Sequence, residues 1–180
     1  MAAERNAEQT RERILQATFE LMYRNGYQGM RVDQILAATG LAKGALYHHF
    51  ANKQALGYAV VDELLQKEME TRWVEPLRDC EDPITAIKQV LEKATCDMTL
   101  EEMQQGCPLN NISQEMAGLD EGFQERLERI YNLWSGSIAQ ALERGQASGT
   151  VKALVEPAVI ATFIISSLQG IIGASKCMQD

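Results

Sequence analysis

The sequence of 180 residues has little of what stabilises metal-dependent or disulfide-linked folds. Its four cysteines, at positions 80, 96, 107 and 177, form no Cys-x-x-Cys pair, and the only two histidines are adjacent, at 48 and 49. A zinc site and a secreted disulfide framework are both disfavoured, so reduced thiols are expected. No nucleophile–base spacing or phosphate-binding loop is visible. A helical enzyme is therefore the least favoured class, and neither cofactor nor metal is expected.

Prolines are also few, and no uninterrupted apolar run is long enough to span a membrane. The four prolines, at 76, 83, 108 and 157, each fall where a helix is expected to begin or end. No cleavable leader is recognised. The most apolar stretch, residues 157–176, carries Thr162, Ser166, Ser167 and Gln169 and lacks interfacial anchors. We expect it to be buried in protein, in a soluble cytoplasmic chain without a membrane partner.

Charge is unevenly distributed along the chain, whose formal net charge is -8. Residues 1–56 hold seven Lys/Arg against five Asp/Glu, whereas residues 57–180 hold ten against twenty. The first part can approach phosphate while the second is repelled by it. This balance predicts weak non-specific binding to DNA and a strong dependence of specific binding on salt.

Two short helices separated by a sharp break are predicted over residues 32–50. Val32, Ile35 and Leu36 give the first helix an apolar edge at helical spacing. Gly40 then ends it, because glycine adopts the left-handed backbone conformation that terminates helices. Leu41 follows and fills the corner between the two helices.

The second helix, residues 43–50, has one apolar face and one small polar face. Leu46 and Phe50 fall on the apolar face. A helix that enters a DNA groove needs a glycine for close approach, and hydroxyl, imidazole or ammonium donors for phosphates and base edges. The pattern indicates a helix-turn-helix with this as the recognition helix. Its outward residues are Lys43, Gly44, Ala45, Tyr47 and His48.

Further cations lie beside this motif. Asn52 is expected to cap the next helix, and Lys53 in its first turn opposes the helix dipole, which favours a phosphate contact over a tolerated surface lysine. Arg31 precedes the motif and is expected to meet a phosphate near a helix N-terminus. Arg11 and Arg13 are either solvated or phosphate neighbours.

The rest of the chain is predicted to form a series of helices. Residues 1–9 are expected to be frayed, and Gly26 to stop the first helix. The helix that begins at Asn52 is expected to continue toward Trp73. Residues 99–118 are the least regular stretch, with a short helix at its end, and residues 145–149 are expected to form a turn. The expected helices are residues 10–25, 83–98, 108–116, 122–144 and 157–176.

Several motifs resemble the N-terminal domain of the TetR/AcrR family of bacterial repressors. They are Thr10-Arg11-Glu12-Arg13-Ile14-Leu15 with Gly26-Tyr27, Gly40-Leu41-Ala42-Lys43-Gly44-Ala45-Leu46-Tyr47-His48-His49-Phe50, and Asn52-Lys53-Gln54-Ala55-Leu56. The resemblance covers residues 10–56. In two places the sequence departs from the family: Ala42 replaces a serine that caps the helix, and Ala45 replaces a common hydroxyl residue. A stabilisation of about 1 kcal/mol from the cap is therefore absent.

The resemblance implies an all-α repressor with a three-helix DNA-binding domain, residues 1–56, and a larger helical domain for ligand sensing and dimerisation, residues 57–180. It implies a homodimer through the last two long helices, so that two heads grip a palindromic double-stranded DNA operator. A small-molecule effector would release the DNA by shifting the helix that begins at Asn52. Control by a protein partner is the alternative if the body is fully packed.

The second domain offers candidates for a ligand pocket. Its aromatic and methionine residues either enclose an apolar cavity or form ordinary core, and for any one of them core is the commoner role. The candidates are Trp73, Met98, Met103, Cys107, Asn110, Phe123, Tyr131, Trp134, Phe163, Gln169 and Lys176.

Cys107 supports a second hypothesis, a regulator that senses electrophiles or oxidants. It follows Gly106 and precedes Pro108 at the start of an expected helix, where the helix dipole is expected to lower the thiol pKa. Some members of the family that sense such compounds have a Gly-Cys at this place and a lysine near the end of the last helix, here Lys176. The alternative is a small buried apolar residue.

Overall fold

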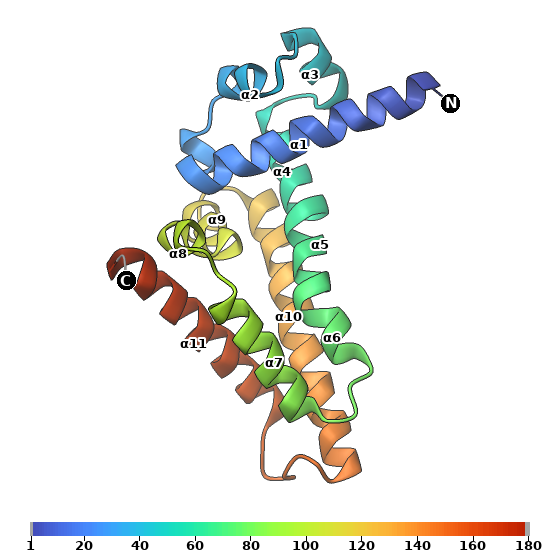
Figure 1. The fold of residues 1–180 in the computed structure, drawn as a ribbon, viewed down its shortest axis with the longest axis vertical. Helices are drawn as coiled ribbons and strands as arrows, with labels where there is room; N and C mark the ends of the chain where they lie inside the picture. Colours follow the sequence, from blue (N-terminus) through green and yellow to red (C-terminus); the bar gives the residue numbers. More distant parts are fainter. Residues whose placement is uncertain (1, 179–180) are drawn as a thin grey trace. The chain divides into compact units, whose positions relative to one another are not determined.

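The computed structural model describes residues 2–178, with side chains from Arg5 onward, and every regular element in this range is helical (Figure 1). The expectation of an all-α chain is confirmed. The α-helices are α1 (Ala2–Gly29), α2 (Val32–Thr39), α3 (Lys43–His49), α4 (Lys53–Ala59), α5 (Gln66–Met69), α6 (Glu75–Arg78), α7 (Pro83–Cys96), α8 (Leu100–Gln105), α9 (Pro108–Met116), α10 (Glu121–Ser148) and α11 (Pro157–Met178). Two π-helical turns, η1 (Val60–Leu65) and η2 (Glu70–Val74), interrupt the sequence of α-helices.

The described chain divides into two compact units. The first contains the residues up to Leu65 together with Asn111–Leu127, and the second contains Gln66–Asn110 and the residues from Glu128 onward. The first unit therefore holds the predicted DNA-binding helices and also a segment from the middle of the chain. We name residues 111–127 the elbow, because they contain the end of α9, the turn after it and the start of α10.

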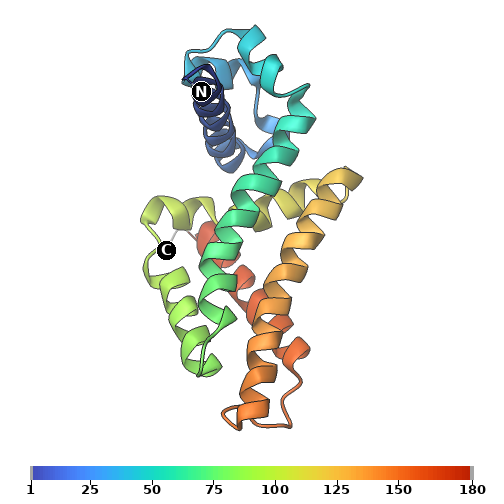
Figure 2. The same cartoon turned by 90° about the vertical axis from the view of Figure 1, so that its right-hand side faces the viewer.

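In the first unit α2 and α3 pack on α1, and α4 follows them (Figures 1 and 2). The apolar face of each helix points into a shared core, which elbow residues complete. Burying one such side chain contributes about 1.5–3 kcal/mol. The buried side chains include Ile14, Leu15, Met22, Met30, Ile35, Leu46, Phe50, Leu56, Val60, Val61, Ile112, Met116 and Phe123.

The first helix begins earlier than its sequence suggested. The prediction that residues 1–9 are frayed is wrong for the described part, because α1 begins at Ala2. Alanine, glutamate, arginine and glutamine all favour helix, and Thr10 Oγ1 donates to the carbonyl of Asn6 at 2.8 Å. The prediction that Gly26 stops the first helix is confirmed, because Gly26 leaves the helical conformation, with φ 73° and ψ 165°, and a separate short turn follows it to Gly29 within α1.

The breaks around α2 and α3 agree with the expected signals. Gly40 ends α2 in the left-handed conformation, with φ 67°, and its amide donates to the carbonyl of Leu36 at 2.9 Å. Asn52 caps α4, since its Oδ1 accepts a hydrogen bond from the amide of Ala55 at 2.7 Å. Beyond α4 the chain stays helical to Arg78 through η1, α5, η2 and α6. The expected long helix from Asn52 toward Trp73 is thus present, with two π-helical turns that its sequence does not reveal.

In the second unit α6 and α7 lie side by side, joined by the short connection 79–82 (Figures 1 and 2). Asp82 caps α7 by accepting from the amides of Ile84 and Thr85 at 3.1 and 3.2 Å. Trp73 packs on Trp134 of α10 with ring centroids 4.9 Å apart. The buried side chains of this unit include Met69, Trp73, Leu77, Ile87, Val90, Ile130, Trp134, Ile138, Leu142, Ala161, Ile165 and Leu168.

Residues 100–105 form a helix that the sequence analysis did not expect. Thr99 begins α8 with a capping box: its amide donates to Glu102 Oε2 at 2.8 Å, and the amide of Glu102 donates to Thr99 Oγ1 at 3.2 Å. The Thr-x-x-Glu spacing is the signal that would have found it. The short helix at residues 108–116 is confirmed as α9.

The turn predicted at residues 145–149 is wrong, because α10 continues to Ser148. Gly145 lies inside the helix and is buried, and a Cβ there would approach Val151 and Pro83 at 2.5 and 2.6 Å. This glycine allows close packing rather than a chain reversal. The reversal falls at Gly149, whose φ is 81°.

The last helix, α11, is long and apolar enough by composition to cross a membrane, and 22% of its most apolar window is buried. The expectation that this stretch is buried therefore holds for one face only. Pro157, Ala161, Ile165 and Leu168 are buried, at the spacing of one helical stripe. Three large apolar residues on other faces are exposed: Val159, Phe163 and Ile171.

Candidate nucleic-acid interface

The orientation of α3 predicted from its sequence is confirmed. Leu46 is fully buried and Phe50 is 4% exposed, so both fix the helix on the core of the first unit. Tyr47 is 40% exposed. Lys43, Gly44 and His48 are exposed as well, and Ala45 is half-buried. The outer face of α3 therefore presents an ammonium, a phenol and an imidazole around Gly44, which has no side chain.

Local contacts order this outer face. Lys43 Nζ lies 5.8 Å from the centroid of the Tyr47 ring, and the rings of His48 and His49 are 5.3 Å apart. The first turn of α3 has no side-chain cap, since Ala42 occupies the N-cap position. The absence of a cap expected from Ala42 is thus confirmed. A short helix without a cap depends on its tertiary packing, here by Leu46, for stability.

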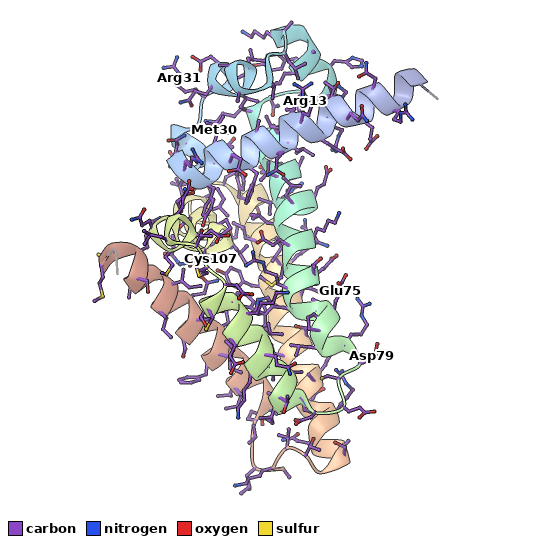
Figure 3. The ribbon with its side chains drawn as sticks, in the orientation of Figure 1. Arg13, Met30, Arg31, Glu75, Asp79 and Cys107 are labelled. Carbon is purple, nitrogen blue, oxygen red and sulfur yellow. The ribbon has the colours of Figure 1, made fainter. Side chains whose placement is uncertain are left out.

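Arg13 and Arg11 have a structural role that neither sequence alternative described. Arg13 Nη2 donates to the carbonyl of Thr39 at 2.8 Å, so it satisfies an acceptor at the end of α2 (Figure 3). Arg11 forms a bidentate pair with Glu63, at 2.6 and 2.5 Å, and lies 5.1 Å from the centroid of the Phe50 ring. The hydrogen bonds with Arg11 lower the pKa of Glu63. Both arginines fix α1 against the helices that carry the interface.

The two cations predicted to hold phosphates have partners within the protein. Arg31 lies at the surface, at the start of α2 (Figure 3), and its guanidinium pairs with Asp33 through Nε at 3.0 Å and Nη2 at 2.8 Å. The same hydrogen bonds lower the pKa of Asp33. Lys53 Nζ donates to the carbonyl of Gln28 at 3.3 Å, and burial lowers its pKa.

Charged residues of the elbow contact other helices of the first unit. Sequence reasoning did not find these contacts. Asp120 Oδ1 accepts from the hydroxyl of Tyr58 at 2.6 Å, and its Oδ2 accepts from Gln54 at 2.7 Å. The hydrogen bond from Tyr58 is the main cause of the lowered pKa of Asp120. Arg126 Nε pairs with Asp62 at 2.9 Å. Glu115 accepts from two backbone amides at the end of α1, at 2.8 Å each.

In the second unit a cavity of about 570 Å³ lies between η2, α6, α7 and α8. Of the residues predicted to bind a ligand, it brings together Trp73 and Met98. Val90 and Ala94 add apolar surface, and Lys93 adds a charge. A cavity of this size and mixed lining suits a small organic molecule.

The other predicted ligand residues are distributed more widely. Trp134 and Tyr131 stack with ring centroids 6.2 Å apart, and Gln169 Nε2 lies 3.6 Å from Cys107 Sγ. Phe123 belongs to the first unit, where its ring contacts Tyr27 and Tyr58. Phe163 is 68% exposed. Lys176 is also exposed, whereas Met103 and Asn110 are half-buried.

The prediction that the pKa of Cys107 is lowered is wrong, although the amides at the start of α9 do act in that direction. Burial raises the pKa of this thiol, although the amides of Asn110 and Leu109 and the side chain of Gln169 act against the rise. Desolvation of the thiolate outweighs the favourable amide dipoles at the start of α9. Among the residues that the structure describes, no three His, Cys, Asp or Glu side chains are grouped so as to hold a metal ion.

The described chain is all-helical, and the second helix of its helix-turn-helix exposes hydrogen-bond donors around a glycine. These features define the class of helix-turn-helix DNA-binding regulators. Two family profiles match the chain: "Bacterial regulatory proteins, tetR family" over residues 14–60 and "Tetracyclin repressor-like, C-terminal domain" over residues 83–180. The chain belongs to the TetR family of transcriptional regulators. Regulators of this family are soluble proteins that bind DNA operators and act as dimers with small-molecule effectors.

Individual relatives and solved structures agree with this membership. An uncharacterised helix-turn-helix-type transcriptional regulator in the lacX 3' region of Lactococcus lactis subsp. lactis is 32% identical over 178 residues, covering 97% of this chain and 87% of that protein. The transcriptional repressor DhaR of Mycobacterium sp. (strain GP1) is 28% identical, with coverages of 90% and 80%. A TetR transcriptional regulator from Chloroflexus aurantiacus J-10-FL superposes with a TM-score of 0.85 at 25% identity, with coverages of 97% and 88%.

Proposed function

We propose that this protein is a cytoplasmic, homodimeric repressor that binds a palindromic operator and releases it when a small molecule occupies its second domain. It acts as a regulator and not as an enzyme. The observation that carries the proposal is the arrangement of α3, which buries Leu46 and Phe50 and leaves Lys43, Tyr47 and His48 at the surface. We assign DNA binding to residues 1–56, and sensing and dimerisation to residues 57–180.

The outer face of α3 is assigned to the major groove. Gly44 and Ala45 allow the backbone to approach the base edges, while Lys43, Tyr47 and His48 donate to phosphates and bases. Arg31 and Lys53 are assigned to phosphates on either side. The pair of Arg31 with Asp33 is solvent-exposed and therefore weak, so the guanidinium can readily exchange Asp33 for a phosphate.

Dimerisation is assigned to α10 and α11. Val159 and Phe163 of α11 are 62% and 68% exposed, and Ile171, farther along the helix, is 59% exposed. Small residues beside them, such as Gly170 and Ala174, permit close contact between helices. A second copy that covers this face removes the apolar surface from water, and it supplies the second head that a palindromic site needs.

The cavity beside Trp73 is assigned to the effector. Its occupant must bind the DNA-free arrangement more tightly than the DNA-bound one by a few kcal/mol to release the operator. The helical segment from Lys53 to Arg78 carries Trp73 at one end and Lys53 at the other, so it is the proposed route of the signal. Its π-helical turn η2 includes Trp73, and π turns are frequent at functional sites.

Fluorescence anisotropy with labelled duplexes from the region upstream of the coding sequence tests DNA binding. Tyr47→Ala and Lys43→Ala are expected to weaken binding about tenfold each, because each removes a phosphate or base contact of about 1–3 kcal/mol. Lys152→Ala, which removes an exposed lysine outside the first unit, is the control and should bind as the unchanged protein does. Equal affinities for all three variants would reject the assignment of the α3 face.

Sedimentation analysis tests the proposed dimer. Phe163→Glu places a charge on the exposed apolar face of α11 and is expected to shift the protein toward monomer. Lys152→Ala lowers the net charge by the same amount at an exposed position outside α11, so it is the matched charge control and should remain a dimer. A Phe163→Glu variant that dimerises as tightly as the unchanged protein would exclude this face from the interface.

A further inference from the structure

The junction between α1 and α2 is held by a carboxylate from a distant part of the chain. Glu115, in the elbow, accepts a hydrogen bond from the amide of Tyr27 through Oε2 and another from the amide of Gln28 through Oε1, each at 2.8 Å. Both contacts lie within the first compact unit. They join residues that are 88 and 87 positions apart in the sequence.

The chemistry of this contact is that of a helix cap supplied from outside the helix. The kink at Gly26 divides α1, and Met30 N donates to the carbonyl of Gly26 at 3.1 Å, which begins a new turn. The amides of Tyr27 and Gln28 stand at the start of this turn and have no helical carbonyl before them to accept their hydrogen bonds. One oxygen of Glu115 satisfies each amide, and charge-assisted hydrogen bonds of this kind are about twice as strong as neutral ones.

Gly26 is required for the carboxylate to reach these amides. A Cβ at Gly26 would lie 2.8 Å from Glu115 Oε2 and 3.0 Å from Oε1. The backbone of Gly26 also has φ 73°, a conformation that favours glycine. The missing side chain therefore provides both the kink and the space for the acceptor.

The capped turn contacts the helices on both sides of α3. Lys53, the first residue of α4, donates to the carbonyl of Gln28 at 3.3 Å, and its ammonium lies 4.8 Å from the centroid of the Tyr27 ring. Burial lowers the pKa of Lys53, and the charge of Glu115 acts against this lowering. Met30, which ends the turn, is 1% exposed and leads directly into Arg31 and α2. The placement of α2 and α4, and hence of α3 between them, depends on this turn.

We propose that Glu115 is a positioning residue for operator binding, which acts by capping the turn that orients α2, α3 and α4. The inference rests on the proposed function, since it assigns a residue to the placement of the DNA-contacting helix. Glu115 lies well outside residues 14–60, the part matched by the N-terminal family profile. The unit that determines DNA affinity therefore includes the elbow, and a change in α9 acts on α3 through this carboxylate.

Two substitutions separate the capping role from general destabilisation. Glu115→Gln preserves the shape but replaces one acceptor oxygen with an amino group that faces a donor, and Glu115→Ala removes both acceptors. Each is expected to weaken operator binding by about tenfold, which is within the usual range for coupling between sites. Glu125→Gln, which changes an exposed carboxylate of the elbow, is the matched control and should not alter affinity.

The dependence of affinity on salt distinguishes positioning from a direct contact with DNA. Loss of a phosphate contact lowers the slope of log affinity against log salt by about one. Because Glu115 touches no phosphate, its variants should keep the slope of the unchanged protein, while Lys43→Ala should lower it. A Glu115→Gln variant that binds the operator as tightly as the Glu125→Gln control would overturn the inference.

Amide hydrogen exchange tests the cap without DNA. The amides of Tyr27 and Gln28 should exchange at least about tenfold faster in Glu115→Gln than in the control, while amides in the middle of α10 should not change. Unchanged exchange at both positions overturns the inference, whatever the DNA result. If the unchanged protein binds no duplex but the two amides lose protection as expected, the cap is confirmed and the proposed function is what fails.

Discussion

Replacing Gly57 with alanine should destabilise the protein, although the same change stabilises most helices. Gly57 is buried in α4, and a Cβ there would lie 2.6 Å from Cε2 of Tyr27 and 2.8 Å from Cζ of Phe123. These two rings pack edge to face, with centroids 4.7 Å apart. Helix propensity favours alanine over glycine by about 1 kcal/mol, whereas overpacking a core costs about 1–3 kcal/mol. We expect a net loss of up to about 2 kcal/mol.

Gly44→Ala is the matched control, because a Cβ at Gly44 of α3 meets nothing within 4 Å. It should leave the protein unchanged or stabilise it by up to about 1 kcal/mol, yet weaken DNA binding by blocking close approach to the duplex. Thermal unfolding followed by circular dichroism measures both variants, and for a chain of this size 1 kcal/mol corresponds to about 2–4 °C. A Gly57→Ala variant that melts at or above the temperature of Gly44→Ala would refute the packing of Tyr27 and Phe123 on α4.

Three further outcomes follow from the structure. Iodoacetamide should modify Cys177 well before Cys107, because burial raises the pKa of Cys107 and Cys177 is exposed; mass spectrometry that finds Cys107 modified first would contradict this. The pKa of Asp120 is lowered in the folded protein, so its contribution to stability is present above the ordinary carboxyl pKa of about 4 and is lost as pH falls through the lowered value. The free energy of unfolding measured in urea should therefore fall less between pH 7 and pH 3 for Asp120→Asn than for the unchanged protein. An equal fall in the two proteins would exclude this role. Val90→Trp should fill the cavity beside Trp73, so the effector should no longer release the DNA, while operator affinity stays within about twofold. Release at the effector concentration that acts on the unchanged protein would place the effector site elsewhere.

The helix-turn-helix could be predicted from sequence because its signals are local. Gly40 and Asn52 each act on the turn in which they lie, and Leu46 and Phe50 share a face by helical spacing alone. The helix at residues 100–105 had an equally local signal in Thr99 and its partner three residues later. The apolar periodicity of this helix is weak, so the capping box is its main indication in the sequence.

Contacts between distant residues could not be predicted in this way. Nothing in the sequence around Glu115 indicates that its partners are the amides of Tyr27 and Gln28, and nothing around Arg13 indicates the carbonyl of Thr39. Cys107 shows a related difficulty. Its position just before α9 is predictable from Gly106 and Pro108, but the burial that decides its pKa depends on residues elsewhere in the fold.

The kinked end of α1 has a consequence for how related sequences vary. Because the carboxylate of Glu115 lies where a Cβ at Gly26 would be, a side chain at position 26 would displace the carboxylate from the two amides. Relatives that carry a side chain at the first position should have lost the acid at the second, whereas those that keep the glycine should retain an acceptor there. An alignment of close orthologues would then show these two columns covarying, even though neither lies on the surface assigned to DNA.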